Sequence, residues 1–414
     1  MDADMRLVLD NASVLDVPGG RLVPNQRVVV HARRIEQVEP AQARLADGTP
    51  GEVVDVRGKT VMPGLCDAHV HVTAWTANLS EMMRSSPFYT AARAAEILHG
   101  MLMRGFTTVR DEGGADYGLA LAVNEGRLTG PRILFCGRTL SQTGGHGDWR
   151  GRGETVVHSL GENVGITHLC DGVPQVRHAA REEIRKGAHH IKLMLSGGVA
   201  SPTDRLTNSQ FAPEEIRAAV EEAENAGLYC TGHAYTTRAV NTALDCGVRS
   251  LEHCNLIDQT SVERFVQHDA FMVPTLVTYE ALAREGVEAG LPAALRDKVF
   301  EVLDHGLRAL DLAYRGGVKL AYGTDLLGAM HKDQLQEFDL RSEVQPPLEV
   351  IRGATTIAAD LFNERGQTGI VAAGARADLL VVDGNPLEDL RCLQDPQRFL
   401  KAILKDGAFY KNEL

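Results

Sequence analysis

Six side chains, far apart in the chain, have the chemistry to bind metal ions together. The segment Asp67-Ala68-His69-Val70-His71 ends an apolar run with two histidines separated by one residue. Successive side chains of a strand alternate between faces, so both imidazoles can reach one cation. Two satisfied polar residues at a strand end are the alternative reading of so short a pattern.

Lys192 lies inside the apolar run Ile191-Lys192-Leu193-Met194-Leu195. Burial disfavours a charged ammonium, so this lysine must be paired, neutral or chemically modified. A neutral lysine can react with carbon dioxide to give a carbamate, whose two oxygens could bridge two cations. An ordinary buried ion pair is the alternative.

His233, His253 and Asp325 end three later apolar runs. Each histidine taken alone is more often a core or surface residue than a ligand. A carboxylate at Asp325 could bind metal and exchange a proton with metal-bound water, although aspartate also favours the N-cap of a helix.

The chain between Pro63-Gly64 and about residue 364 alternates strand-like runs with helical patterns, which is typical of βα repeats and a parallel sheet. One expected helix opens at Pro213-Glu214-Glu215 and closes at Ala226-Gly227. Eight repeats predict a (β/α)8 barrel. The expected strands are 65–71, 107–110, 133–136, 190–194, 229–233, 250–253, 271–274 and 319–322.

Both ends of the chain read instead as short β segments separated by turns. We therefore predict an α/β protein, with a TIM-like barrel at 64–364 and a small β-sandwich domain from 1–63 plus 365–414. Active sites of such barrels form where the strands end. Ligand-type residues at the ends of strands one, four, five, six and eight are thus expected to converge on metal.

Composition limits the function classes. The 414 residues carry 43 basic and 55 acidic side chains, a net charge of −12, which disfavours nucleic acid and anionic membranes as partners. No stretch is long and apolar enough to span a bilayer, and no signal segment opens the chain, so a cytoplasmic location is expected. A mature form of an exported protein would look the same. Seven scattered cysteines indicate buried thiols.

The segments Pro63 to His71, Gly323-Thr324-Asp325 and Gly374 to Leu379, together with Lys192, His233 and His253, resemble the amidohydrolase superfamily over nearly the whole chain. Ser141 to Asp148, Ile191 to Asp204 and Gly232 to Tyr235 are similar to one branch of it. That branch holds prolidase-like zinc dipeptidases, arginine or lysine carboxypeptidases and ochratoxin-hydrolysing amidohydrolases.

The resemblance implies that His69, His71 and Asp325 hold the more buried of two divalent metal ions, most simply Zn²⁺. His233 and His253 would hold the other, with carboxylated Lys192 and a hydroxide bridging both. Asp325 would pass the proton of the hydroxide to the leaving amine. Homo-oligomerisation, as far as an octamer, is also implied.

Two further residues are candidates for stabilising the oxyanion. His146, in a glycine-rich loop, and Tyr235, two residues past His233, could donate hydrogen bonds to it. A surface histidine and a packed aromatic are the alternatives. The long connection at about 137–176 contains Arg150 and Arg152, either of which could bind a substrate carboxylate, or lie solvated at the surface.

The leading function is hydrolysis of the amide bond before a C-terminal residue in dipeptides or N-acyl amino acids. The runner-up is a xenobiotic amidase for ochratoxin-like N-aroyl-phenylalanine, or for phenylurea or carbamate substrates. A deaminase or cyclic-amide hydrolase fits the branch less well. A non-catalytic scaffold is the alternative outside enzymes, and the intact ligand set counts against it.

Overall fold

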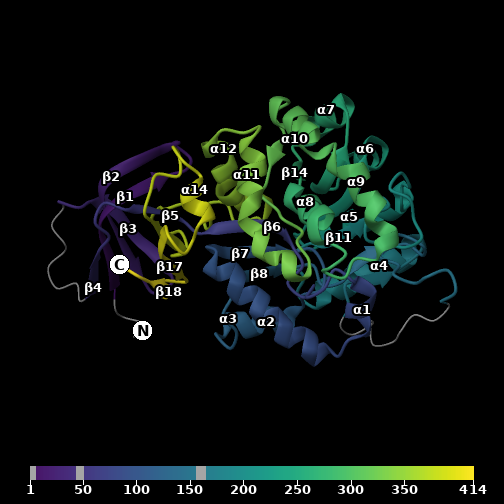
Figure 1. Ribbon diagram of the computed structural model, residues 1–414, viewed down its shortest axis with the longest axis horizontal. Helices are drawn as coiled ribbons and strands as arrows, with labels where there is room; N and C mark the ends of the chain where they lie inside the picture. The colour runs from purple at the N-terminus through teal and green to yellow at the C-terminus, as the bar shows by residue number, and fades with distance from the viewer. Residues whose placement is uncertain (1–5, 43–50, 155–164) are drawn as a thin grey trace. The chain divides into compact units, whose positions relative to one another are not determined.

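The computed structural model describes residues 6–42, 51–154 and 165–414, shown as a ribbon in Figure 1. The chain divides into two compact units. The first takes in the described parts of 1–67, with 100–108 and 345–414, and the second consists of the described parts of 68–99 and 109–344. The predicted domain limits, 1–63 with 365–414 and 64–364, stay a prediction.

The first unit contains one sheet of eight strands in the order β18-β17-β16-β5-β1-β2-β3, with β4 paired to β1. The two ends of the chain meet where β5 runs antiparallel to β16, with Val61 opposite Val381. This sheet confirms the predicted terminal β domain. Its strands are β1 (Arg6–Asp16), β2 (Arg21–His31), β3 (Arg34–Pro40), β4 (Gly51–Asp55), β5 (Thr60–Pro63), β16 (Leu379–Val382), β17 (Leu400–Lys405) and β18 (Ala408–Asn412).

Alternation of side chains along these strands builds the core of the first unit. Leu7 and Leu9 in β1 are two residues apart, as are Val28 and Val30 in β2, so each pair points to one face. All four are buried in one apolar cluster. Residues Leu379, Val381, Ala402 and Leu404 from the other end of the chain complete this cluster.

The barrel strands lie in the second unit, except for the first residues of β6 and β7. Its eight strands follow the predicted runs: β6 (Leu65–Val70), β7 (Phe106–Asp111), β8 (Arg132–Phe135), β11 (Ile191–Met194), β12 (Cys230–Thr236), β13 (Ser250–Leu256), β14 (Phe271–Val273) and β15 (Lys319–Leu320). The pairing from β11 to β15 is parallel throughout.

Backbone hydrogen bonds close the barrel. The N–H of His189 donates to Phe135 O over 2.8 Å and links the segment before β11 to β8. The N–H of Ala68 in β6 donates to Tyr322 O, just past β15, over 2.7 Å. The predicted (β/α)8 fold class is thereby confirmed.

Helices connect and cover the strands; α4 and α5 lie beside β11 (Figure 1). Helix α5 starts as predicted at Pro213, and the Glu215 carboxylate accepts the backbone N–H of Ala212 over 2.6 Å. The helices are α1 (Leu79–Arg84), α2 (Pro87–Met103), α3 (Tyr117–Asn124), α4 (Gly172–Arg185), α5 (Pro213–Asn225), α6 (Thr237–Asp245), α7 (Gln259–Gln267), α8 (Leu276–Glu285), α9 (Arg296–Leu303), α10 (Gly306–Arg315), α11 (Glu337–Ser342), α12 (Pro347–Arg352), α13 (Ala358–Leu361) and α14 (Arg391–Gln394).

The long connection at 137–176 contains two short strands that the sequence did not predict, β9 (Thr139–Ser141) and β10 (Thr167–Leu169). They pair in parallel, and Leu140 of β9 lies opposite Leu193 of β11. Part of this connection, residues 155–164, lies outside the described residues. Within the described part, the pairing of β9 with β11 anchors the connection to the barrel.

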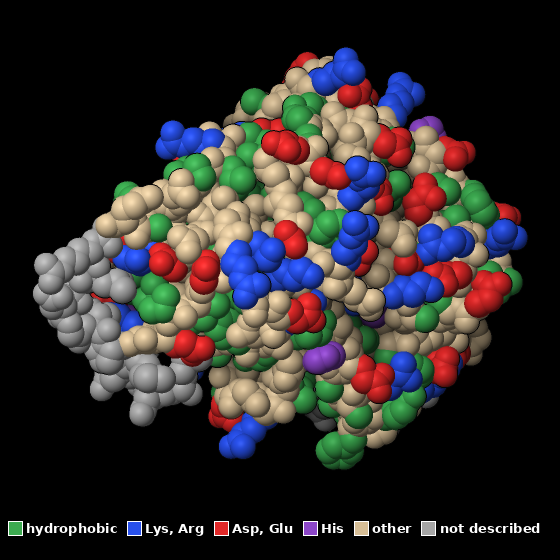
Figure 2. Space-filling view, turned by 60° about the vertical axis from the view of Figure 1, so that its left-hand side comes forward, with side chains coloured by type: hydrophobic (Ala, Val, Ile, Leu, Met, Phe, Trp, Pro, Cys, Tyr) green, Lys and Arg blue, Asp and Glu red, His purple; other side chains and the backbone are tan. Residues whose placement is uncertain are grey.

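Charged side chains of both signs are intermixed on the face shown in Figure 2. Exposed pairs such as Arg185 with Glu182 and Arg315 with Asp311 are spaced three or four residues apart on helices. Such pairs each contribute little to stability. Within the described residues, no helix combines the length and hydropathy that crossing a membrane requires.

Candidate metal centre and active-site cavity

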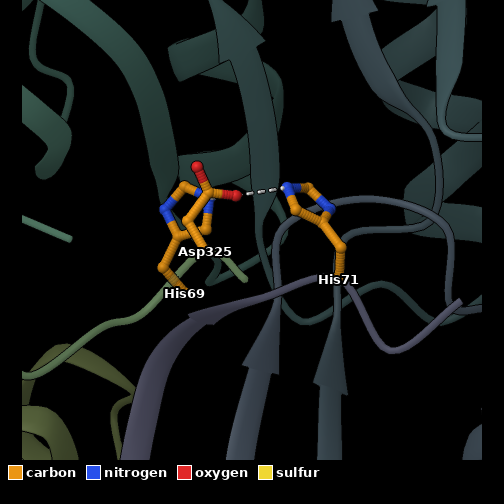
Figure 3. Close-up of side chains that lie close together, drawn as sticks. All are labelled: His69, His71 and Asp325. Carbon is orange, nitrogen blue, oxygen red and sulfur yellow. Dashed lines mark ion pairs between the residues drawn. The ribbon is translucent and has the colours of Figure 1, made fainter. Parts of the chain in front are cut away.

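Three of the predicted ligands meet at the carboxyl end of the barrel (Figure 3). His69 is in β6 and His71 follows it, while Asp325 follows β15 in a left-handed backbone conformation (φ 51°). The Asp325 N–H donates to His69 O over 2.8 Å, which ties the two segments together. Asp325 Oδ1 lies 3.3 Å from His69 Nε2 and 3.2 Å from His71 Nε2.

Hydrogen bonds on the far side of each ring fix which nitrogen carries the proton. His69 Nδ1 is 2.9 Å from Glu252 Oε2, and His71 Nδ1 is 2.9 Å from the carbonyl oxygen of Gly113. Both partners only accept, so each Nδ1 donates and each ring turns its Nε2 toward Asp325. Asp325 Oδ1 and the two Nε2 atoms therefore need positive charge between them, which protons on the rings or a metal cation can supply.

The electrostatics of the three residues agree with this requirement. Burial and Lys192 lower the pKa of His69, but Asp325 and Glu252 outweigh them and raise it to about 9. Burial raises the pKa of Asp325, yet the neighbouring His69 and His71 hold it well below its usual range. The space between His69, His71 and Asp325 thus favours a positive charge. Histidines that donate their other N–H to a carboxylate or carbonyl are typical metal ligands.

His233 and His253 come from β12 and β13 and lie beside this group. Their ring centroids are 4.6 Å apart, and the ring of His253 is 5.1 Å from that of His69. His233 Nε2 is 3.1 Å from Gly197 O and His253 Nδ1 is 2.8 Å from Thr275 Oγ1. Burial holds the pKa of both rings well below the usual range, so each keeps one nitrogen lone pair free to bind a cation.

Lys192 in β11 forms a buried ion pair: Nζ is 2.7 Å from Glu112 Oε2. The Thr231 hydroxyl also donates to that oxygen over 2.6 Å, and Arg110 Nε lies 3.0 Å from Glu112 Oε1. The sequence left a carbamate and an ordinary ion pair open for Lys192, and the structure shows the ion pair.

Sequence reasoning missed Arg110, Glu112 and Glu252, all fully buried inside the barrel. Arg110 bridges the other two, since Nη2 is 3.0 Å from Glu252 Oε1. Burial raises the pKa of Glu112, but Arg110 and Lys192 outweigh it and hold that pKa well below the usual range. The sequence could have indicated such residues, because a charged residue inside an apolar strand is the same pattern that singled out Lys192.

His146 and Tyr235 lie on the wall of the same cavity. The ring of His146 stacks on that of His233 with centroids 4.2 Å apart, and burial lowers its pKa to about 4. Tyr235, in β12, accepts a hydrogen bond of 3.0 Å from the Tyr279 hydroxyl. Accepting this bond leaves the Tyr235 O–H free to donate.

The structure does not bring the two predicted arginines to the described cavity wall. Arg150 is paired with Asp148 through two short contacts, of 2.7 and 2.6 Å. Arg152 is exposed. Their role in binding a substrate carboxylate stays a prediction.

The cavity lies within the second unit, to which all of its lining residues belong. Polar ligand-type side chains line one part and apolar ones the remainder, which suits a small substrate with an apolar group. The apolar wall consists of Leu79, Trp149, Ile166, Met194, Val199, Ala200, Leu282, Leu291 and Leu327.

Gly198 permits the close approach of the His146 ring. A Cβ at Gly198 would lie 2.0 Å from His146 Cε1. We expect Gly198→Ala to displace the ring and lower kcat/KM by about 10²-fold, the order of loss that a shift of ~1 Å produces. Gly153→Ala is the control, since its Cβ meets no atom within 4 Å. Equal kcat/KM for both variants, measured alongside Tm, would contradict the prediction.

Residues 60–407 match the model of the amidohydrolase family. The chain belongs to that family. Ochratoxinase from Aspergillus niger is 32% identical over 369 residues, which cover 86% of this chain and 76% of the relative. This amidohydrolase is thus a hydrolytic enzyme that acts on amide bonds, in a superfamily that depends on metal ions.

Solved structures extend the similarity over almost the whole amidohydrolase. A prolidase in complex with N-methylphosphonate-L-proline is 47% identical, with a TM-score of 0.96 over 99% of this chain and 100% of that one. A Xaa-Pro dipeptidase with methionine bound in its active site is 28% identical, with a TM-score of 0.88 over 98% and 100%.

Proposed function

We propose that the protein is a dinuclear-zinc hydrolase that cleaves the amide bond before a C-terminal residue of a dipeptide or N-acyl amino acid. The observation that carries the proposal is the convergence of the His69 and His71 Nε2 atoms on Asp325 Oδ1. Similarity to a prolidase and a Xaa-Pro dipeptidase supports the substrate class. Proline would suit the apolar part of the cavity wall.

The donor set fits two divalent cations. His69, His71 and Asp325 would hold one, and His233 and His253 the other, with Lys192 between them as a carbamate. Such a pair of cations lowers the pKa of water and polarises the scissile carbonyl. In this proposal the protein contributes placement of the substrate, proton transfer and stabilisation of the developing oxyanion.

Carboxylation of Lys192 requires its amine to lose a proton. The neutral nitrogen then forms a bond to the carbon of carbon dioxide, and its second proton is released, leaving a carbamate with one negative charge. Glu112 does not lose its compensation, because Arg110 and the Thr231 hydroxyl still contact it at 3.0 and 2.6 Å. Two cations would balance the added negative charge.

Asp325 is placed to move the proton. Its pKa lies well below the usual range, so the carboxylate is ionised. As a general base it would accept a proton from the attacking water. It then delivers that proton to the leaving nitrogen. This delivery matters because an unprotonated amide nitrogen is a very poor leaving group.

Tyr235 is the proposed donor to the oxyanion. We expect Tyr235→Phe to lower kcat by about 10²–10³-fold, as for loss of one oxyanion donor. Tyr279→Phe should lower kcat about tenfold with KM unchanged, since it removes only the bond that orients Tyr235. Tyr410→Phe in β18, in the other unit, is the control. Unchanged kcat in Tyr235→Phe would exclude the donor role.

The second candidate is a xenobiotic amidase, favoured by the 32% identity to ochratoxinase. The test is metal analysis followed by hydrolysis of three substrate sets: dipeptides, N-acyl amino acids and an N-aroyl-phenylalanine. We expect about two zinc ions per chain, as in two-metal hydrolases, and highest kcat/KM for the first two sets. Preference for the N-aroyl compound favours the amidase, and a metal-free, inert protein favours a scaffold.

A further inference from the structure

A second pocket lies between helices that cover the barrel, apart from the active-site cavity. It is bounded by α8, α10, α11 and the turn between α9 and α10 (Figure 1). Its volume is about 250 Å³, whereas one water molecule needs only ~10–15 Å³. The described residues of its wall all belong to the second unit, and none of them lines the active-site cavity. The second pocket is therefore a separate place with room for a small molecule.

The wall of the second pocket combines an apolar surface with two acidic groups. Leucine side chains form the apolar surface: Leu276, Leu303, Leu307 and Leu340. Glu280 and Asp304 are exposed, and neither side chain pairs with another described residue. Carboxylates accept hydrogen bonds and carry negative charge, so they complement a cation, whereas the leucines complement an apolar group. A small organic ammonium ion with an apolar body has both properties.

Asn255 supplies a further acceptor next to the second pocket. It is 3% exposed, and its Nδ2 donates to Val302 O over 3.1 Å. A carbonyl oxygen only accepts, so the orientation of the amide is fixed, and Oδ1 has no partner among the described residues. Nδ2 would lie 3.4 Å from a Cβ at Gly306, a residue of the pocket wall. A buried acceptor without a partner is costly, and an ammonium is the kind of donor that it lacks.

Tyr279 connects the second pocket to the active site. It is 1% exposed and belongs to the pocket wall, while its hydroxyl donates to the Tyr235 hydroxyl over 3.0 Å. Tyr235 in turn lines the active-site cavity. A ligand in the second pocket would add van der Waals contacts to the Tyr279 ring and so restrict its movement. Because the Tyr279 hydroxyl orients Tyr235, this restriction reaches the proposed donor to the oxyanion.

We propose that the second pocket binds a primary ammonium ion with an apolar body, and that the bound ion raises kcat through Tyr279 and Tyr235. The apolar body packs on the leucines and the Tyr279 ring, and the ammonium lies at Glu280 and Asp304. Such a ligand is an effector, because it occupies a site distinct from that of the substrate. Binding is independent of the proposed function, whereas the effect on kcat rests on the donor role of Tyr235.

Binding is tested by isothermal titration calorimetry of the zinc-loaded protein with phenethylammonium, a phenyl ring joined to an ammonium by two carbons. The neutral comparison is 2-phenylethanol, which has a hydroxyl in place of the ammonium. We expect phenethylammonium to bind at least about tenfold more tightly, as for a hydrogen bond to a charged group. Its affinity should fall as salt is added, because salt screens exposed carboxylates. Equal affinities for the two compounds, or no binding, would overturn the proposal.

A double substitution locates the bound ion. Glu280→Gln with Asp304→Asn keeps the shape of both side chains but removes their charge, and we expect about tenfold weaker binding, as for loss of two exposed ion pairs. The matched control is Glu263→Gln with Asp297→Asn, which changes two exposed acids of α7 and α9 outside the pocket wall. The control should bind phenethylammonium as the wild type does. Equal affinity in the two double variants would place the ion elsewhere and overturn the inference.

Kinetics test the link to the active site, with whichever amide substrate the protein hydrolyses fastest. At saturating phenethylammonium we expect kcat to rise about twofold with KM unchanged, a small change in the barrier. Tyr279→Phe retains the ring but lacks the hydroxyl, so it should bind the ligand with wild-type affinity while its kcat no longer responds. A wild-type kcat that stays constant on binding, or a Tyr279→Phe kcat that rises as in the wild type, would overturn the role of Tyr279.

Discussion

Lys192→Ala is expected to reduce kcat/KM by at least about a thousandfold, roughly 4 kcal/mol of transition-state stabilisation, and to lower the zinc content of the purified protein. Lys192 is 1% exposed and lies on the cavity wall with the four histidines of the proposed ligand set. Alanine cannot form a carbamate, so the two proposed metal positions would lose their shared ligand. Metal analysis and turnover of a dipeptide measure the two effects separately.

The fold should survive this substitution. Glu112 keeps Arg110 and Thr231 as partners when the lysine is removed, so no buried carboxylate is left alone. Circular dichroism and Tm establish this point. Lys332→Ala is the matched control, because that lysine is 59% exposed and pairs only at the surface with Glu285. A Lys192→Ala protein with full zinc content and wild-type turnover would show that Lys192 is only an ion-pair partner.

Asp325→Asn is expected to lower kcat by about 10³–10⁴-fold, toward the upper end of the contribution of general acid–base catalysis. Asparagine retains the shape of the side chain but neither accepts the proton nor supplies the negative charge that faces His69 and His71. The affinity for one zinc ion should also fall. Kinetics at saturating zinc separate the two losses.

A comparison of an ester with a dipeptide separates proton delivery by Asp325 from its other roles. An activated ester has a leaving group that needs no proton, so Asp325→Asn should slow ester hydrolysis far less than dipeptide hydrolysis. Asp269→Asn serves as the control, since that carboxylate is 82% exposed and pairs with Lys319. Equal losses on the ester and the dipeptide would restrict Asp325 to charge and metal binding, without proton delivery.

The positions of the six proposed ligands could be predicted from the sequence, because they follow from the periodicity and order of the strands. His69 and His71 share a face because side chains alternate, and Lys192, His233, His253 and Asp325 gather because parallel strands end at one rim of a barrel. Each of these positions is given by local pattern and strand order. The structure places all six residues on the wall of one cavity.

Hydrogen-bond partners were not predictable in the same way. Arg150 appeared free to bind a substrate, but it pairs with Asp148 two residues away. Tyr279 orients Tyr235 from a helix 44 residues further along the chain, and Lys298 reaches Asp204 across 94 residues. No periodic pattern encodes these pairings, because they depend on which side chains of separate segments approach to about 3 Å.

The barrel, the terminal β domain and the residues at the rim of the barrel were therefore predictable from the sequence, since burial of apolar side chains repeats at fixed spacing along a strand or helix. The hydrogen-bond partners of the histidines depend instead on contacts that form only in the folded chain. Glu252 and Gly113 make Nδ1 the donor in His69 and His71, and Ser201 Oγ lies 2.8 Å from His146 Nδ1. A ring nitrogen donates or accepts according to the atom opposite it, and folding alone brings that atom into place.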